Sequence, residues 1–186
     1  MEDDPEVFLL EADERMEKTV DLLRGEMMQV RTGRAHPGIL DGVKVNYYGT
    51  PTPLNKLATV SVPEARLLTV QPFDPNSSEA IIAAIRDGGM GLNPSSQDGH
   101  IIRVPIPELS EERRRDYVRL VKKLGEDARI AIRNIRRETN DRIRKLEHIG
   151  EDEVKRQLEE VQKLTDRQVS VLDAMIVQKE KDLETL

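Results

Sequence analysis

A segment of 75 residues, 35–109, interrupts a chain whose other parts follow the period of long amphipathic helices. Before the segment, apolar side chains recur every three or four positions, as on one face of a helix. The same period returns after Ser110 and breaks again only at Ile149-Gly150. Because the helices have to meet around the insertion, we expect two bodies joined by two chain crossings.

Three long helices are predicted outside the insertion. The first fades near Gly33, because glycine favours helix ends. The second begins at Ser110, a good N-cap followed by two acids, and runs to Ile149, a length of about 60 Å. The third begins at Glu151, after a very short link that makes it an antiparallel neighbour of the second. The predicted apolar stripes are Leu9, Ala12, Met16, Val20, Leu23, Met27 and Val30; then Tyr117, Val121, Leu124, Ala128, Ile132, Ile135, Thr139 and Leu146; then Val154, Leu158, Val161, Thr165, Leu172 and Met175.

The insertion has the pattern of a small α/β unit. Alternating apolar residues predict strands at 43–47, 58–62, 67–70 and 101–106, and the segment 48–53 is expected to be a turn. A short helix should hold Ile81, Ile82 and Ile85, with its cap at 76–78. We predict an α+β fold, in which residues 1–34 and 110–186 form a three-helix bundle and residues 35–109 form an inserted β/α/β domain.

The charge of the chain is unevenly distributed. The net charge is −6, yet residues 111–149 carry 13 basic and 8 acidic side chains, a net +5. At about 100° per residue, eight of the 13 basic side chains fall on one face of this helix and four of the eight acids on another, although Glu126 and Glu147 lie on the basic face. The residues on this face are Arg115, Arg119, Lys122, Arg129, Arg133, Arg136, Arg137 and Arg144. A basic face rich in arginine suits phosphate binding, while a solvated face paired with neighbouring acids is the plainer interpretation.

Several motifs appear in a fixed order along this plan. They are RTGRAHPGILDG at 31–42, YYGTPTPLNKLA at 47–58, GLNP at 91–94, RVPIPELSEERR at 103–114 and RIAIRNIRRETND at 129–141. In this order they resemble the bacterial ribosome recycling factors, over nearly the whole chain. The resemblance implies an L-shaped two-domain arrangement with the outline of a transfer RNA. It also implies binding to the large ribosomal subunit after termination. With elongation factor G and GTP, such proteins split the ribosome into subunits, and messenger and transfer RNA are lost.

The resemblance also implies which residues do this work. Contacts to ribosomal RNA are expected from Arg31, Arg34, Arg129, Arg133, Arg136 and Arg137, and Lys122 lies on the same basic face. The crossings are expected to act as a hinge at Gly33, Ala35, Pro37, Gly38, Pro105 and Pro107. Because Phe8 and Tyr117 lie on or beside apolar stripes, we expect recognition of RNA shape and phosphate without an aromatic platform.

No catalytic, metal or cofactor site is expected. Cysteine is absent, and the three histidines lie far apart in sequence. The acidic N-terminus resembles no signal peptide and no apolar run approaches 18 residues, so we expect a monomer in the cytoplasm. Two alternatives remain open: an oligomeric coiled-coil or chaperone-like protein, and a hydrolase that uses carboxylates of the insertion. Those carboxylates, without paired spacing, are Asp41, Glu64, Asp74, Glu79, Asp87, Asp98 and Glu108.

Overall fold

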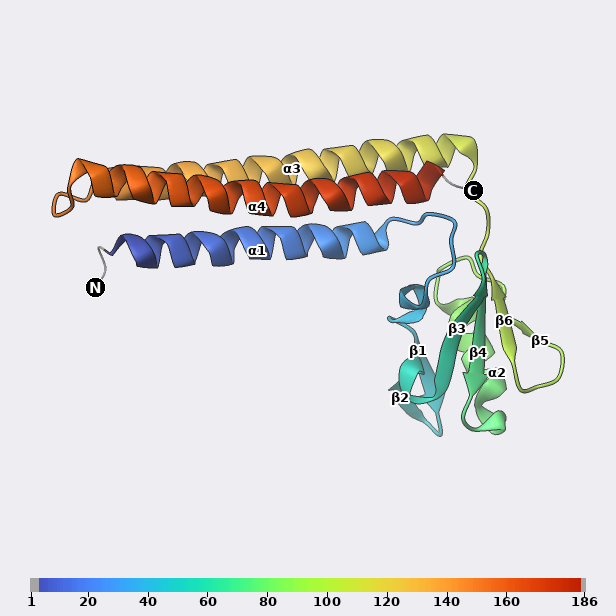
Figure 1. Cartoon of the computed structure of the whole chain (residues 1–186). Helices are drawn as coiled ribbons and strands as arrows, with labels where there is room; N and C mark the ends of the chain where they lie inside the picture. The colour runs from blue at the N-terminus through green and yellow to red at the C-terminus, as the bar shows by residue number, and fades with distance from the viewer. Residues whose placement is uncertain (1–3, 185–186) are drawn as a thin grey trace. The chain divides into compact units, whose positions relative to one another are not determined.

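The computed structural model describes residues 4–184, so residues 1–3 of the acidic N-terminus and residues 185–186 lie outside the description (Figure 1). The chain forms two compact units. The first contains the described residues up to Val30 and those from Glu111 onward, and the second is Arg31–Ser110. The division lies four residues before the predicted start of the insertion and one residue after its predicted end. The α+β class is confirmed.

The first unit consists of three long helices, α1 (Pro5–Gln29), α3 (Glu111–Arg144) and α4 (Glu151–Glu184), which lie side by side (Figure 1). Asp4 caps α1, because its carboxylate accepts a hydrogen bond from the Glu6 backbone N–H at 2.9 Å. Acidic residues open α3 and α4, where the helix dipole favours negative charge. The three predicted helices are therefore confirmed, including their charged first turns.

The core of the bundle follows the predicted stripes with local shifts. Phe8 is buried where Leu9 was predicted, and Ile176 takes the place of Met175. In α3 the buried positions include Gly125 and Ile143, which were not predicted, while Leu124 is half-buried. The shift at Gly125 has a packing reason: a Cβ there would lie 2.2 Å from Cδ1 of Ile176. The backbone of α3 therefore approaches α4 closely at this point.

The end of α3 corrects the sequence-based expectation. The helix stops at Arg144 rather than Ile149, so its 34 residues span about 51 Å. The N–H groups of Lys145 and Leu146 reach carbonyls three residues back, both at 3.2 Å, which closes the last turn tightly. Residues 145–150 then form the link, which is longer than predicted. One consequence is that Glu147 lies outside the helix and does not interrupt its basic face.

The second unit is a small α/β structure. Its helix is α2 (Ser78–Asp87), and its strands are β1 (Lys44–Tyr47), β2 (Thr50–Pro53), β3 (Ala58–Glu64), β4 (Leu67–Pro72), β5 (Ser95–Ser96) and β6 (Ile102–Pro105). Short 3₁₀ turns lie at Pro37–Leu40, Leu54–Lys56 and Pro75–Ser77. The strands form an antiparallel hairpin, β1-β2, and an antiparallel sheet in the order β3-β4-β6-β5 (Figure 1). The core is apolar and fully buried at Val45, Leu68, Val70, Ile81, Ile85, Ile102 and Val104.

One prediction inside this unit was wrong. Most of the segment 48–53 is strand β2, and only Tyr48 and Gly49 form the turn of the hairpin. The N-cap of α2 is Ser77, within the predicted segment 76–78, although its side chain makes no capping hydrogen bond. Asp74 caps the 3₁₀ turn that leads into the helix, where its carboxylate accepts a hydrogen bond at 3.0 Å from the Asn76 backbone N–H.

Candidate nucleic-acid interface

Five of the seven predicted RNA-binding residues lie on α3. They are Lys122, Arg129, Arg133, Arg136 and Arg137. Because these positions are fixed on one helix, their common face follows from α-helix geometry. Their environments differ, however, and the difference separates side chains that hold the bundle together from those that remain available to a ligand.

Arg129 connects α3 to α4. Its Nη2 and Nε donate to Oδ1 of Asp173 at 2.6 and 2.9 Å, and only 29% of its side chain is exposed. These hydrogen bonds to Asp173 raise the pKa of Arg129 above its ordinary value, with a further contribution from Glu126. The guanidinium is thus engaged within the protein, which favours a packing role for Arg129.

Glu126 bridges two of the arginines. Its carboxylate lies 3.2 Å from Nη1 of Arg129 and 3.7 Å from Nη1 of Arg133. Lys122 has a weaker partner, since its Nζ lies 4.0 Å from Glu180 of α4. The acid that interrupts the basic face is therefore part of an ion-pair network that orients its neighbours.

Arg136 and Arg137 are the least engaged. Nη1 of Arg136 donates to the Gln162 side chain of α4 at 3.2 Å, an uncharged partner. Arg137 is exposed, and within residues 4–184 its side chain makes no hydrogen bond or ion pair. About half of the Arg133 side chain is also exposed, at 52%. Arg133, Arg136 and Arg137, here called the arginine cluster, present forked donors to solvent on consecutive turns of one helix.

Arg31 and Arg34 belong to the other unit. Both are exposed and follow the end of α1, with Gly33 between them at a φ of 77°. The Arg34 backbone N–H points to Oγ1 of Thr32 at 3.4 Å. They are close to each other in the chain, whereas the arginine cluster belongs to the helical unit.

The predicted hinge residues fall into two groups. Pro37 and Gly38 lie in a 3₁₀ turn, where Nδ1 of His36 accepts from the Gly38 N–H at 3.0 Å, and Pro105 ends β6 opposite Leu67. The backbone of Ala35 is bonded to the carbonyl of Ala65 at 2.7 Å. Gly33 and Pro107 lie on the segments that lead to the helices, outside any helix or strand, and among the described residues neither has a backbone bond of the kind that ties Ala35 to the second unit.

Three carboxylates of the insertion have structural partners. Asp74 caps a turn and accepts a hydrogen bond from Tyr47, and Glu108 is ion-paired with Arg66. Asp98 accepts backbone bonds from His100 and Ile101 at 3.0 and 3.1 Å, and these bonds lower its pKa below the usual range. Among the described residues no three His, Cys, Asp or Glu side chains gather as metal ligands, and no helix is long and apolar enough to cross a membrane.

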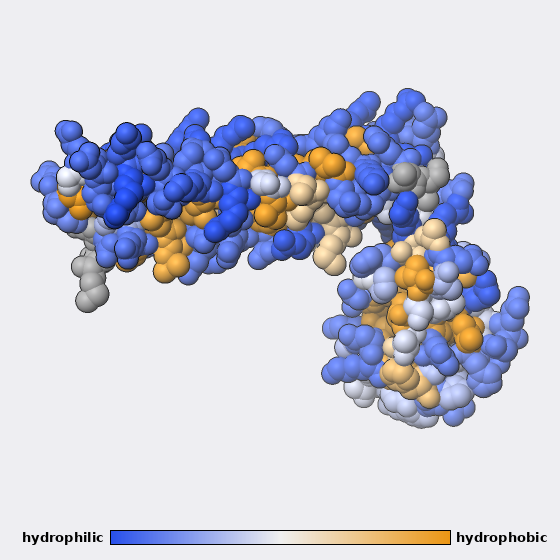
Figure 2. All heavy atoms as spheres, in the orientation of Figure 1, coloured by the Kyte–Doolittle hydropathy of each residue, from blue (hydrophilic) through white to orange (hydrophobic). Residues whose placement is uncertain are grey.

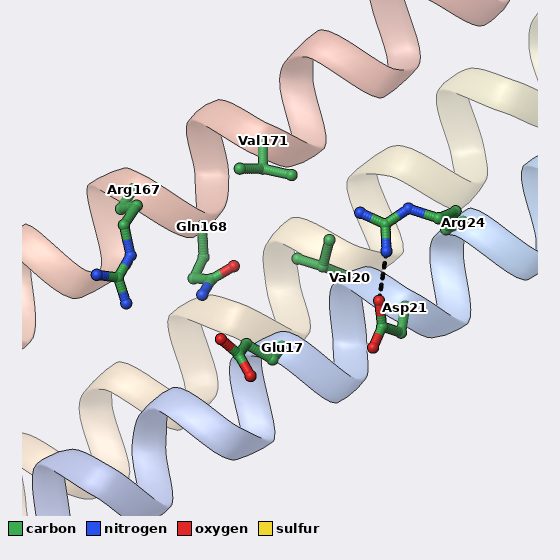
Figure 3. Close-up of a pocket in the computed structure, with 7 residues that line it drawn as sticks. All are labelled: Glu17, Val20, Asp21, Arg24, Arg167, Gln168 and Val171. Atoms are coloured by element: carbon green, nitrogen blue, oxygen red, sulfur yellow. Dashed lines mark hydrogen bonds and ion pairs between the residues drawn. The ribbon is translucent and has the colours of Figure 1, made fainter.

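A shallow groove runs between α1 and α4. Figure 3 shows that its walls are Glu17, Val20, Asp21 and Arg24 of α1, and Arg167, Gln168 and Val171 of α4. The arginines are paired within the protein, Arg24 with Asp21 and Arg167 with Asp13. Because the charges compensate each other, this groove does not offer a second anion site. Hydrophilic side chains cover most of the visible surface of the helices (Figure 2).

The sequence analysis missed two exposed aromatic residues. Tyr48 is 80% exposed and Phe73 is 67% exposed, both in the second unit. A signal was present for Tyr48, because a two-residue Tyr-Gly step between alternating segments is the spacing of a hairpin turn. Of the two aromatic residues that were placed on or beside apolar stripes, Phe8 is buried and Tyr117 is half-buried.

Known proteins resemble the chain over nearly its whole length. The family model described as "Ribosome recycling factor" matches residues 23–183. The ribosome-recycling factor of Bordetella pertussis is 48% identical over 178 residues, which cover 94% of this chain and 95% of that protein. That of Geobacillus kaustophilus is 49% identical over 176 residues, with coverages of 93% and 95%.

Solved structures agree with this match. A solution structure of the ribosome recycling factor superimposes with a TM-score of 0.80 at 42% identity, covering 98% of both chains. The T. thermophilus ribosome recycling factor, placed with E. coli elongation factor G on the E. coli post-termination complex, gives a TM-score of 0.67 at 42% identity, covering 97% and 99%. The helices, the insertion and these matches together show that the chain belongs to the ribosome recycling factor family.

Proposed function

We propose that the chain is a translation factor that binds the large ribosomal subunit after termination. With elongation factor G and GTP it splits the post-termination ribosome, so that mRNA and tRNA are released and the subunits are recycled. Family membership supports this role, as does the relative that is bound with elongation factor G to a post-termination complex. The factor acts as a monomer in the cytoplasm and is not itself an enzyme; the GTPase supplies the free energy.

The arginine cluster carries the proposal for RNA binding. Arg133, Arg136 and Arg137 lie on one helix face with few internal partners, in a chain whose net charge is −6. Ribosomal RNA offers phosphates along its backbone, and the planar guanidinium binds them through paired hydrogen bonds. Lys122 and Arg129 extend the same face, with Arg129 holding the bundle together. Arg31 and Arg34 provide further positive charge on the first crossing.

Arg136 is the residue that best tests the RNA contact. The residue is half-buried, and within residues 4–184 its side chain makes one hydrogen bond, to an uncharged amide. The Arg136→Ala variant is expected to bind large subunits about 1–3 kcal/mol more weakly while its thermal unfolding stays unchanged. The dependence of binding on salt should also become shallower, because fewer counterions are displaced.

Co-sedimentation with purified large subunits, measured at several salt concentrations, decides this prediction. Thermal unfolding is measured on the same preparation. Arg156→Ala serves as the matched control, since Arg156 is 68% exposed on α4 and paired within its own helix. A variant at Arg136 that melts early but binds normally would show that the residue stabilises the bundle instead.

A hinge between the units is the mechanical part of the proposal. Ala35 and Ile106 are pinned to the second unit by backbone hydrogen bonds of 2.7 and 2.9 Å, so bending is expected at 31–34 and 107–110. The positive φ of Gly33 can be adopted by other residues only with strain. We expect the residual dipolar couplings of the two units to require separate alignment tensors. The Gly33→Ala variant should change how these two tensors differ. One common tensor in both proteins would argue against bending at these segments.

A further inference from the structure

Arg136 differs from other basic residues of α3 in the partner that a neighbouring helix offers it. Lys122, Arg129 and Arg142 each meet a carboxylate of α1 or α4. Arg136 instead donates from Nη1 to Oε1 of Gln162, an amide of α4, at 3.2 Å. A carboxylate neutralises a guanidinium, whereas an amide oxygen accepts a hydrogen bond and leaves the positive charge in place. The contact with Gln162 therefore keeps the full charge of Arg136 available to an outside ligand.

The amide of Gln162 is itself held by a second residue of α4. Its Nε2 donates to Oδ1 of Asp166 at 2.8 Å, one helical turn further along. This bond fixes which end of the amide faces Arg136. If the amide were rotated by half a turn, its oxygen would face the carboxylate of Asp166 and its NH2 group would face the guanidinium, and both contacts would be repulsive. Asp166 thus keeps a hydrogen-bond acceptor directed at Arg136.

The contact restrains Arg136 and leaves most of its donors available. Within residues 4–184 the bond to Gln162 is the one hydrogen bond of the Arg136 side chain, and Gln162 and Asp166 are both exposed. A long arginine side chain has many rotamers, and ordering it on binding costs free energy. Because Gln162 already restrains the guanidinium in the unbound protein, part of that cost is absent when a ligand binds. An exposed bond of this kind contributes little to folding, since water can replace either partner.

We propose that Gln162 is a positioning residue for RNA binding, which holds the Arg136 guanidinium ready for a backbone phosphate and leaves its charge intact. The ligand is the phosphodiester backbone of ribosomal RNA, which Arg136 meets with its remaining N–H donors. The inference rests on the proposed function, because it assigns a residue of a second helix to the same RNA contact. Gln162 acts through Arg136 and does not itself have to touch RNA.

Gln162→Glu turns the amide into a carboxylate that pairs with Arg136. Binding to large subunits should weaken by about three- to tenfold, because a phosphate then has to displace an ion pair. The melting temperature should move by less than about 2 °C, because one exposed ion pair replaces one exposed hydrogen bond. Gln178→Glu is the matched control: Gln178 bonds to Asp182, four residues further along α4, at 2.9 Å. This control adds the same charge to the same helix and should bind nearly as the unchanged chain.

Gln162→Met removes the amide without changing the charge. Binding should weaken by about three- to fivefold, because the guanidinium then has to be ordered when RNA binds. Both substitutions at Gln162 are repeated in the Arg136→Ala background. There each should change the affinity by less than about 1.5-fold, since the positioning residue has no guanidinium left to hold. A local effect of charge or packing at Gln162 would persist in that background, so the double variants separate positioning from a structural role.

Co-sedimentation with purified large subunits at one fixed salt concentration measures all these affinities, and thermal unfolding is followed on the same preparations. Losses of affinity in both Gln162 variants that vanish in the absence of Arg136 support the inference. It is overturned if either variant binds as the unchanged chain, if Gln178→Glu loses as much affinity as Gln162→Glu, or if the losses persist without Arg136. If the unchanged chain itself does not bind large subunits, the proposed function fails and this inference with it, so the two failures are distinguishable.

Discussion

Replacing Arg133, Arg136 and Arg137 together by alanine is expected to weaken binding to the large ribosomal subunit by at least about 100-fold. Each lost phosphate contact costs about 1–3 kcal/mol, and the three losses add only in part because the side chains are neighbours. The slope of the logarithm of the binding constant against the logarithm of the salt concentration should become shallower by about 2–3. The reason is that close to one counterion is released for each phosphate that is neutralised. Thermal unfolding should change little, because the cluster makes one ion pair of 3.7 Å and one hydrogen bond of 3.2 Å.

A matched variant separates local contact from overall charge. Replacing Arg24, Arg156 and Arg167 by alanine removes the same three positive charges, so both variants carry −9 instead of −6. These residues are exposed on α1 and α4. Equal losses of affinity in the two variants would show that only net charge matters. If the variant without the arginine cluster binds as tightly as the unchanged chain, α3 is not part of the RNA interface.

Gly125→Val is expected to lower the free energy of unfolding by about 1–3 kcal/mol, because it forces extra atoms into a packed contact. Even a Cβ at this position would lie 2.2 and 2.8 Å from two side-chain atoms of Ile176, which is only 6% exposed. The buried isoleucine has little room to move, so α3 and α4 would have to separate. Chemical denaturation followed by circular dichroism measures the change.

Gly25→Ala provides the contrasting case on α1. Apart from its chain neighbours and the backbone of its own helix, no heavy atom of the described residues lies within 4 Å of the added carbon, so alanine should stabilise the helix by about 0.5–1 kcal/mol. Alanine at 176 makes room for the valine at 125. The double variant Gly125→Val/Ile176→Ala should therefore lose less free energy of unfolding than the two single variants lose in sum. Strictly additive effects would mean that the strain at Gly125 arises elsewhere.

The insertion shows where local patterns are insufficient. Pro51 and Pro53 argue against a strand, yet β2 tolerates them because its only partner is β1. The predicted turn, 48–53, therefore included all four residues of β2. β5, with two residues, is too short to produce an alternating pattern, and it exists because β6 offers it an edge.

The helices and their basic face could be inferred from the amino-acid sequence, because helical period and angular position are properties of neighbouring residues. The same holds for the α+β class, since the change of period marks the insertion. Only the tertiary structure decided which arginine is engaged. Arg129 meets Asp173 across 44 residues of chain, whereas Arg137 two turns later meets no partner among residues 4–184. Whether an arginine of α3 is paired depends on which side chain of α4 faces it. The packing of two separate helices cannot be inferred from the residues next to that arginine in the sequence.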